Sequence, residues 1–384
     1  MLERIQPLPG ESVAVAAAAG RVLAAPAVAV VDLPPFASSA MDGFAVRAAD
    51  LPGRLRVVAR IPAGRPVDRV LGAGEAMGIS TGGVVPAGAD AVVPVEYVVE
   101  NDNEIEVAEP SAAGANVRPR GGDVAAGDTV VPAGARLGVA AVGALAAAGI
   151  ATVECGRRPR VAVVATGTEL APPGQPLEPG QVYEANASML AAAAAASGAE
   201  IEVLPVAEDT EEAHRAALER GLAGDVLVTS GGVSVGVHDL VRRVEAELGV
   251  AEVFWRVAVK PGKPVVFGVR ERTLVFGLPG NPVSSLVGFE LFVRPALLAL
   301  QGAAEPLPRL ARATLARSVR RTSGRDELLR ARLREVDGEL VADPLAGQES
   351  HMIARAAQAE ALVYIERGDG EVPAGASVRY LQLG

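Results

Sequence analysis

Cysteine and histidine are scarce in this chain of 384 residues. Cys155 is the only cysteine, which excludes an internal disulfide, a thiolate zinc site and a cysteine-held iron–sulfur cluster. The histidines, at positions 214, 238 and 351, show no close metal-ligand spacing. Any transition metal must therefore be bound transiently, or through ligands that a substrate supplies.

Aromatic residues and surplus positive charge are also lacking. Aromatics make up 3% of the chain and the formal net charge is −10 at pH 7, so we expect no nucleic-acid partner. An acidic protein can still bind phosphate, because backbone N–H groups and one or two lysines form such sites locally. Small anionic ligands therefore stay in consideration.

Long apolar runs are absent as well. No uninterrupted run reaches the roughly 18–20 residues that a membrane span needs, and the N-terminus, MLERIQPLPG, has no apolar core like that of a signal peptide. We therefore expect a cytoplasmic protein without a membrane partner. The length favours about two to four domains over a single hydrophobic core.

The first part of the chain suggests a linker interrupted by an insertion. Residues 1–30 look helical, with an alanine-rich segment that ends near Gly20, and residues 31–120 hold short β-like runs broken by Gly and Pro. The run RLGVAAVGALAAAGI predicts a helix, followed by a strand over ATVEC. If the two helices pair, residues 1–30 and 121–156 form one linker domain, and the β-rich residues 31–120 are inserted into it.

Strands alternate with helices over residues 157–302, which predicts an α/β sheet covered by helices on both faces. We expect strands over VAVVAT, EIEVLPV, DVLVTS, VFWRVAV, PVVFGV and TLVFGLP. We expect helices over SMLAAAAAASG, TEEAHRAALERGL, HDLVRRVEAELG and SSLVGFELFVRPALLALQG. Short β-runs with turn signals over residues 303–384 predict a small β-barrel or sandwich. The fold class is thus multidomain α/β plus β.

Loops rich in glycine follow the strands of the α/β stretch. They are Gly167-Thr168-Glu169-Leu170, residues 231–236 with Asp239 behind them, Lys260-Pro261-Gly262-Lys263-Pro264, and residues 278–284. Ligands of open α/β sheets bind at the carboxyl ends of the strands, so we expect these loops to meet at one edge. Glycine lets backbone N–H groups approach an anion, and Lys260 and Lys263 can act as point charges on phosphate.

Carboxylates accompany these loops. Glu169 and Asp239 would repel a phosphate by themselves, but acids beside an anion site commonly hold Mg²⁺, which bridges them to the phosphate oxygens. Asp209 and Asp225, near other strand ends, are candidates for the same set. Each of these loops and acids alone is more often a turn, a helix cap or a solvated carboxylate. Their combination favours a site.

A second set of motifs lies outside the α/β stretch. It comprises residues 33–46, residues 78–93 with a Gly-Ala-Asp triplet, and residues 118–123. Asp42-Gly43 is a turn dipeptide and Gly88-Ala89-Asp90 reads as a loop before a strand. The residues alone assign these motifs no role.

Taken together, the motifs resemble those of the molybdopterin molybdenumtransferase (MoeA) family, whose animal relative is the gephyrin E domain. The resemblance rests on SAMDGFA at 39–45, Thr81-Gly82 with PAGADAVV at 86–93, TSGGVSVG at 229–236, KPGKP at 260–264 and GLPGNPVS at 277–284. These motifs are long, occur in this order and span nearly the whole chain.

The resemblance implies an elongated homodimer of four-domain subunits, with an α/β molybdopterin-binding third domain and a β-barrel fourth domain. It implies adenylylated molybdopterin and molybdate as substrates, AMP and molybdenum cofactor as products, Mg²⁺ as the cation, and a molybdopterin adenylyltransferase upstream. The cleft would lie between the third and fourth domains of one subunit and the second domain of the other. The molybdenum ligands would be the two sulfurs of molybdopterin, which fits a chain with one cysteine.

By their places in the motifs, individual residues acquire implied roles. The implied catalytic positions are Asp42, Thr81, Asp123, Glu169, Asp209 and Asp239, of which Glu169, Asp209 and Asp239 are also the implied metal ligands. The implied substrate-binding positions are Gly231, Gly232, Ser234, Gly236, Arg256, Lys260, Lys263, Pro279, Asn281, Pro282 and Ser350.

The chain also departs from the family pattern. Thr168 stands where the family usually has an aspartate, Ala37-Ser38-Ser39 where Asp-Asn-Ser is common, Arg256 where a lysine often occurs, and Glu349 where glycine is usual. Three functions stay open: an insertase, a non-catalytic or divergent pterin-binding or scaffold protein, and a phosphate-ester or nucleotide hydrolase on the same sheet. Molybdate-dependent release of AMP distinguishes the first from the others. Tungstate is an alternative oxyanion.

Overall fold

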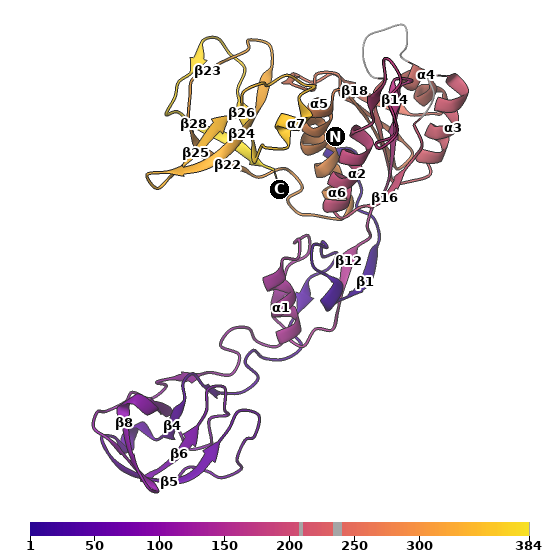
Figure 1. Ribbon diagram of the computed structural model, residues 1–384. Coiled ribbons are helices and arrows are strands. Elements are labelled where there is room, and N and C mark those ends of the chain that lie inside the picture. The colour runs from indigo at the N-terminus through magenta and orange to yellow at the C-terminus, as the bar shows by residue number, and fades with distance from the viewer. Residues whose placement is uncertain (207–209, 233–239, 384) are drawn as a thin grey trace.

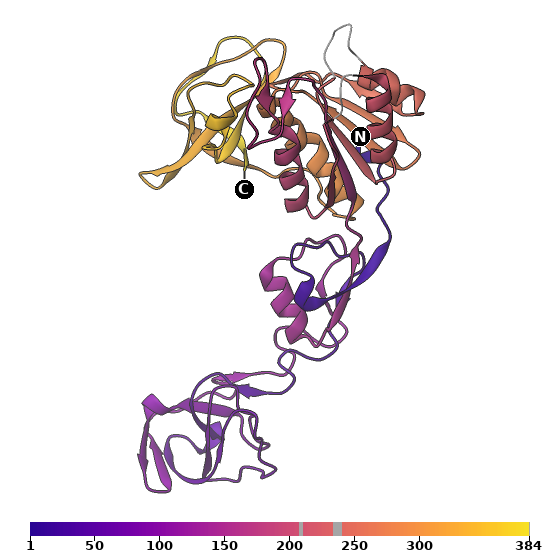
Figure 2. The same cartoon turned by 45° about the vertical axis from the view of Figure 1, so that its right-hand side comes forward.

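The computed structural model describes residues 1–206, 210–232 and 240–383 and shows an elongated molecule (Figure 1). An α/β lobe and a β-barrel lie side by side at one end, and a second β lobe lies at the other end. A narrow linker with β1 (Gly10–Ala14), β12 (Thr152–Gly156) and α1 (Val139–Ala147) joins the two ends, and the turned view shows the same separation (Figure 2).

The linker is built on a two-stranded antiparallel sheet. β1 (Gly10–Ala14) pairs with β12 (Thr152–Gly156), so the segments before and after the far β lobe lie side by side. β2 (Ala27–Val28) pairs with β11 (Thr129–Val131), and α1 (Val139–Ala147) forms where a helix was predicted. The helix predicted within residues 1–30 is wrong. That segment forms the short 3₁₀ turns η1 (Leu2–Arg4) and η2 (Val15–Ala17) and the strands β1 and β2.

The far lobe is a six-stranded sheet with the order β7-β4-β6-β5-β9-β8. Its strands are β4 (Gly43–Val46), β5 (Gly53–Ile61), β6 (Glu75–Ile79), β7 (Ala91–Pro94), β8 (Val98–Asn101) and β9 (Glu104–Val107), with the 3₁₀ turns η3 (Ala48–Asp50) and η4 (Val95–Tyr97). β3 (Ser38–Ser39) pairs with β10 (Val117–Arg118) where the chain enters and leaves the lobe. Phe44, Leu55 and Ile105 form its core.

The α/β lobe contains a six-stranded mixed sheet with the order β16-β13-β17-β21-β20-β18. Its strands are β13 (Arg160–Ala165), β16 (Glu200–Val203), β17 (Val226–Ser230), β18 (Ala251–Trp255), β20 (Val266–Arg270) and β21 (Thr273–Leu278), with β14 (Leu170–Ala171) and β15 (Val182–Tyr183) outside it. The strands from β16 to β21 in this order run parallel, β20 runs antiparallel to β21, and β18 runs antiparallel to β20 and so in the direction of the parallel strands.

Helices cover both faces of this sheet, as predicted. α2 (Asn186–Ala196), α5 (Pro282–Gly288) and α6 (Arg294–Leu300) pack on one face, where Leu190, Val293 and Leu297 join the main core. α3 (Glu211–Gly221) and α4 (Leu240–Glu247) pack on the other face through Leu218 and Val244.

The last helical segment of this lobe is not a single α-helix. Between α5 and α6 lies η5 (Phe289–Val293), a π-helical turn that ends two residues before Pro295, which has no N–H to donate. The segment Pro282–Leu300 has 19 residues and a mean hydropathy of 1.6, enough by length and composition for a membrane span, but 67% of it is buried inside the fold. The criterion of an uninterrupted apolar run did not select it, because Glu290 and Arg294 lie within it as an ion pair.

The C-terminal lobe is a closed five-stranded β-barrel, which confirms the predicted architecture. The pairings β24–β25, β25–β22, β22–β28, β28–β26 and β26–β24 close the ring. Its elements are β22 (Leu310–Leu315), β24 (Asp326–Val336), β25 (Glu339–Pro344), β26 (Ala361–Ile365) and β28 (Ser377–Gln382), with β23 (Val319–Arg320), β27 (Glu371–Val372) and α7 (Ile353–Ala356) beside them. β19 (Val259–Lys260) comes from the α/β lobe and pairs with β24, so it ties the two lobes together. The residue boundaries of the four domains stay predictions.

Candidate active site

Three parallel strands end at the same edge of the α/β sheet. β13, β17 and β21 are neighbours, so the loops that follow Ala165, Ser230 and Leu278 leave the sheet together. The N–H of Thr166 donates to the carbonyl of Ser230 at 3.1 Å, and the N–H of Gly231 donates to the carbonyl of Leu278 at 3.0 Å. The expectation that these strand-end loops meet at one edge is therefore confirmed for the described residues.

Asn186, the first residue of α2, holds two of these loops. Its amide nitrogen donates to the hydroxyl of Ser230 at 2.8 Å and to the carbonyl of Gly280 at 2.7 Å. Gly231 has a φ of 98°, and a Cβ on it would lie 2.8 Å from the carbonyl oxygen of Thr166. Glycine is thus required at this position both by the backbone conformation and by the space available.

The loop with Lys260 and Lys263 reaches the same region between the sheet and the barrel. Its Gly262 lies against α5, since an added Cβ would stand 3.4 Å from the carbonyl of Ser284. The ammonium group of Lys260 lies 3.2 Å from a carboxylate oxygen of Glu327 on β24. The side chain of Glu327 is 8% exposed and that of Lys260 is 48% exposed, so a carboxylate buried at the barrel wall holds a lysine that faces solvent. Lys263 is exposed.

Arg256 begins this loop. Its N–H donates to the carbonyl of Val265 at 2.9 Å, and its guanidinium group stacks on Trp255, with 3.8 Å between the guanidinium carbon and the ring centroid. Arg256, Lys260 and Lys263 thus place three cations on one loop beside the sheet edge. Such a loop favours an anionic ligand.

Ser350 is brought to the start of α5 by the barrel. The N–H of Val283 donates to the carbonyl of Ser350 at 3.0 Å. The loop of Ser350 is fixed by the buried Arg330, whose guanidinium donates to the carbonyls of Gly347 at 2.8 Å, Glu349 at 3.1 Å and Met352 at 2.8 Å. Burial lowers the pKa of Arg330, which nevertheless stays protonated at neutral pH.

The structure therefore gathers many of the implied substrate-binding positions in one region. Pro279 and Asn281 lie in the loop before α5 and Pro282 is the first residue of that helix, next to Gly231 and to Ser350. Ser234, Gly236, Asp209 and Asp239 lie outside the described residues. Gly232 has a φ of 66°, and an added Cβ would stand 2.4 Å from the side chain of Val241.

Of the implied metal ligands, only Glu169 lies in the described part of the chain. It is exposed, and its carboxylate oxygens stand 2.5 and 2.7 Å from the point where a Cβ on Gly167 would lie. Glycine at 167 therefore leaves the space that the carboxylate occupies. Within residues 1–206, 210–232 and 240–383, no group of three or more His, Cys, Asp or Glu side chains is arranged to hold a metal ion.

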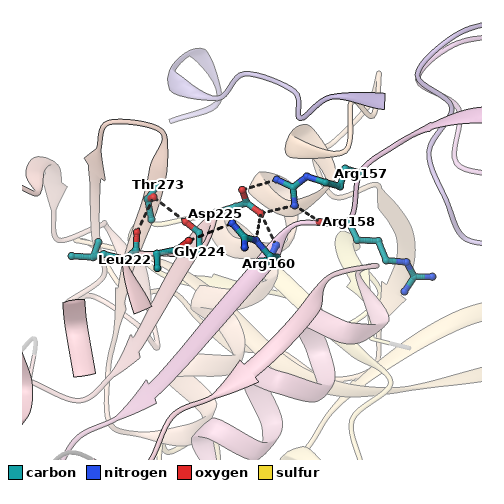
Figure 3. Close-up of polar contacts among 8 residues, drawn as sticks. Arg157, Arg158, Arg160, Leu222, Gly224, Asp225 and Thr273 are labelled. Atoms are coloured by element: carbon teal, nitrogen blue, oxygen red, sulfur yellow. Dashed lines mark hydrogen bonds and ion pairs between the residues drawn. The ribbon is translucent and has the colours of Figure 1, made fainter. Parts of the chain in front are cut away.

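Asp225 does not belong to this set, which corrects the sequence-based suggestion. It precedes β17 and therefore lies at the opposite, amino-terminal edge of the sheet, where Figure 3 shows it among arginines. Its carboxylate accepts two hydrogen bonds from the Arg157 guanidinium, at 2.8 and 3.0 Å, and one from the N–H of Arg160 at 2.7 Å. Although burial raises the pKa of Asp225, these hydrogen bonds outweigh it and keep the pKa below its ordinary value.

Asp42 and Thr81 are brought together, but in the far β lobe. A carboxylate oxygen of Asp42 accepts from the N–H of Thr81 at 2.6 Å, and both side chains are exposed. Asp123 is exposed where the chain returns from this lobe, with its N–H donating to the carbonyl of Leu33 at 2.9 Å. Within one chain the linker separates this lobe from the edge of the α/β sheet (Figures 1 and 2).

Sequence reasoning missed three residues that organise the site: Asn186, Glu327 and Arg330. Glu327 and Arg330 lie in the run DELLRARLREV, where β24 carries buried residues on both faces. A charged residue inside such a run was the available signal, because a buried charge needs a specific partner. No pattern in the sequence marks Asn186 as a bridge, since its two acceptors come from distant loops.

Three protein-family models match successive parts of the chain. The family model described as MoeA N-terminal region (domain I and II) matches residues 1–149. The model described as probable molybdopterin binding domain matches residues 162–299, and that described as MoeA C-terminal region (domain IV) matches residues 312–383.

Curated relatives and solved structures are similar to the chain over its full length. A protein named molybdopterin molybdenumtransferase 2 from Mycobacterium tuberculosis is 38% identical over 381 residues, covering 95% of this chain and 93% of the relative. A molybdopterin molybdenumtransferase from Haemophilus influenzae is 35% identical over 386 residues, covering 98% and 95%. The crystal structure of a molybdopterin biosynthesis moeA protein from Pyrococcus horikoshii OT3 has a TM-score of 0.85 at 29% identity, covering 100% and 97%.

Proposed function

The chain belongs to the MoeA family, and from this premise we propose that it inserts molybdenum from molybdate into adenylylated molybdopterin, with release of AMP and molybdenum cofactor. Membership of this family makes the chain a transferase of molybdenum-cofactor biosynthesis. Relatives named molybdopterin molybdenumtransferase, 31% to 38% identical over nearly the whole chain, support it.

The meeting of three loops at one sheet edge is the observation that carries the proposal. The loop with Lys260 and Lys263, the loop that leads into α5 and the Ser350 loop come from separate segments, and the first and last of them both contact the first turn of α5. Adenylylated molybdopterin and molybdate are both anions, so each requires cations and N–H donors of this kind. In the proposed reaction water breaks the phosphoanhydride bond, AMP leaves, and the pterin keeps its own phosphate.

We include Mg²⁺ in the proposal, held by Glu169 together with Asp209 and Asp239. Glu169 fits this role, because its carboxylate is exposed at the sheet edge and Gly167 leaves space for it. Thr168 supplies a neutral hydroxyl beside it. When bound, the ion would supply charge neutralisation at the phosphoanhydride and lower the pKa of a bound water.

We also propose a homodimer in which the far lobe of one subunit completes the site of the other. Asp42 and Thr81 lie on exposed surface of that lobe, which a single chain keeps away from its own sheet edge (Figure 1). In such a dimer the far lobe of each subunit lies against the sheet edge of the other subunit and supplies the missing half of its site. The proposal further places the enzyme in the cytoplasm, downstream of a molybdopterin adenylyltransferase.

The test is AMP release from adenylylated molybdopterin by the purified full-length protein with Mg²⁺, with and without molybdate. We expect release that depends on molybdate, with tungstate as a second oxyanion to compare. Glu169→Gln should lower the rate at least tenfold if Glu169 holds the metal. Replacing a residue that merely supports a metal ligand already lowers activity or metal affinity by about 10- to 100-fold. Glu178→Gln, an exposed glutamate of the following loop, is the matched control and should keep the rate.

The other outcomes assign other functions. Binding of the adenylylated pterin without AMP or cofactor formation indicates a divergent or scaffold protein. Release of AMP that is independent of molybdate indicates a hydrolase on the same sheet.

A further inference from the structure

Trp255, at the end of β18, is flanked by two arginines. The guanidinium carbon of Arg256 lies 3.8 Å from the centroid of the indole ring and that of Arg242 lies 4.2 Å from it. Two guanidinium groups so close to one centroid would overlap if they lay on the same face. They therefore lie on opposite faces, where the electron-rich ring attracts both cations.

The two arginines differ in what surrounds them. The Arg242 side chain is 23% exposed and donates to the carboxylate of Glu252 at 2.7 Å. Arg256 is exposed, and no described carboxylate forms an ion pair with it. The outer face of the Arg256 guanidinium and its full charge are therefore available to a ligand.

The backbone holds Arg256 in an uncommon conformation. Its φ is 73°, in the left-handed region that residues other than glycine rarely adopt. The bond from its N–H to the carbonyl of Val265 keeps it at the base of the loop that bears Lys260 and Lys263. Strain of this kind persists where the surrounding structure maintains it, and it is concentrated at functional sites.

The indole itself has an unsatisfied donor. Its Nε1–H is buried and has no acceptor among the described residues. A buried donor without an acceptor is destabilising, and a phenylalanine has no such donor. The larger face of the indole, which attracts a guanidinium more strongly than a phenyl ring does, is the property that distinguishes it here.

Building on the proposed function, we propose that Arg256 recognises the planar heteroaromatic ring of a phosphate-bearing substrate by stacking its outer face on that ring. Lys260 and Lys263, on the same loop, hold the phosphate. Guanidinium groups stack on aromatic rings, and such stacking needs no specific hydrogen bonds from the ring. Adenylylated molybdopterin carries two such rings, a pterin and an adenine.

The protein carries its own reporter for this contact, because Trp255 is the only tryptophan in the sequence. We would titrate the full-length protein with AMP, a pterin monophosphate and ribose 5-phosphate, which carries a phosphate without a ring. Calorimetry gives the three Kd values, and Trp255 fluorescence is followed for AMP and ribose 5-phosphate. We expect at least one ring ligand to bind about tenfold more tightly than ribose 5-phosphate, within the range of stacking on one base.

Two matched variants separate stacking from charge. Arg256→Lys keeps the positive charge and removes the planar guanidinium group. The Kd of ribose 5-phosphate should stay unchanged, and its ratio to the Kd of the ring ligand should fall to about one. The ring ligand that loses affinity is the one that stacks. Arg242→Lys makes the same change on the other face of the indole, where Glu252 already binds the guanidinium, and should retain the preference.

Equal affinity for all three ligands in the unmodified protein would overturn the proposal. An equal loss for all three in Arg256→Lys would also overturn it, because Arg256 would then bind the phosphate. So would an Arg242→Lys variant that loses the preference to the same extent. Failure of this proposal is distinguishable from failure of the proposed function. A preference for ring ligands without molybdenum insertion would contradict the insertase function and leave the stacking proposal intact. Molybdenum insertion without a preference for ring ligands would contradict the stacking proposal and leave the insertase function intact.

Discussion

The backbone N–H of Val283, in the first turn of α5, donates to the carbonyl oxygen of Ser350 at 3.0 Å. Val283 belongs to the α/β lobe and Ser350 to a loop of the barrel, so this bond joins the two lobes at the edge of the candidate site. Arg330 holds the same loop through three backbone carbonyls, from the face of β24 opposite to Leu329 and Ala331, which point into the barrel core. The position of Ser350 therefore depends on a buried arginine of β24 as well as on the bond to α5.

Replacing Arg330 should release this loop. Arg330→Met keeps most of the buried volume but removes the donors to the carbonyls of Gly347, Glu349 and Met352, and we expect a loss of roughly 3 kcal/mol in the stability of the barrel. Hydrogen exchange of residues 347–352 and thermal unfolding measure the effect. Arg332→Met, at an exposed position bonded to Gln358, should change neither. Unchanged exchange in the Arg330 variant would contradict this role.

Lys260 and Lys263 should respond differently to removal. Lys260→Ala leaves the buried Glu327 carboxylate without its cation, so it should lower both thermal stability and the affinity for a phosphate ligand such as AMP. Lys263→Ala should lower only the affinity, by roughly tenfold, since Lys263 is exposed and forms no ion pair with a described residue. Calorimetry measures the affinity of each variant for AMP, and thermal unfolding measures its stability. An equal loss of stability in the two would argue against the Glu327 contact.

The sheet and barrel could be predicted from the sequence because their apolar runs determine which residues are buried. VAVVAT and TLVFGLP became β13 and β21, whose buried side chains form the main core. The helix prediction for the alanine-rich N-terminal segment was wrong for the opposite reason. Its helix propensity is weak evidence, and pairing of Gly10–Ala14 with Thr152–Gly156, more than a hundred residues away, overrides it.

The candidate site was predictable in part for a similar reason. Motifs show which loops carry glycine and lysine, and the parallel strand order brings those loops to one edge. Whether a carboxylate precedes or follows a strand decides the edge at which it lies, and Asp225 precedes one. Glu327 and Arg330 could not be assigned, because their partners, Lys260 and the Ser350 loop, come from segments with no regular spacing to them.

Asp225 should support the stability of the α/β lobe in a pH-dependent way. Its folded pKa lies below the ordinary 3.8, since the hydrogen bonds from Arg157 and Arg160 outweigh the opposing effect of burial. A depressed pKa means that the carboxylate stabilises the fold above its unfolded pKa and that this contribution disappears as the pH falls through the folded value. Asp225→Asn should therefore cost roughly 2 kcal/mol at about pH 7, and progressively less below about pH 4.

Urea unfolding followed by Trp255 fluorescence measures this effect, because Trp255 lies in the same sheet as β17. Glu219→Gln, at an exposed position of α3, is the control and should show no such loss at either pH. A difference between Asp225→Asn and the unmodified protein that stays constant down to about pH 3 would contradict the linkage.

A site shared between subunits predicts that two impaired variants restore each other when rates are measured at substrate concentrations below the Kd. Asp42→Asn alters the far lobe and Lys263→Ala alters the sheet edge, so each homodimer should lack an intact site. A mixed dimer has one site that carries both changes and one that carries neither. Random exchange makes half of the dimers mixed, and half of the sites in those are intact, so about a quarter of the wild-type rate should return.

The decisive control for this experiment is a chain that carries both changes, mixed with the single variant Asp42→Asn. In that mixture every site has an altered Asp42, whichever subunit supplies it, so no rate should return. Light scattering must show a dimer, and exchange between differently tagged chains must be demonstrated before the rates are compared. If mixed dimers form and mixing the two single variants raises the rate no further than the variants reach alone, Asp42 does not act on the partner's sheet edge. The far lobe would then need another explanation for its exposed Asp42–Thr81 contact.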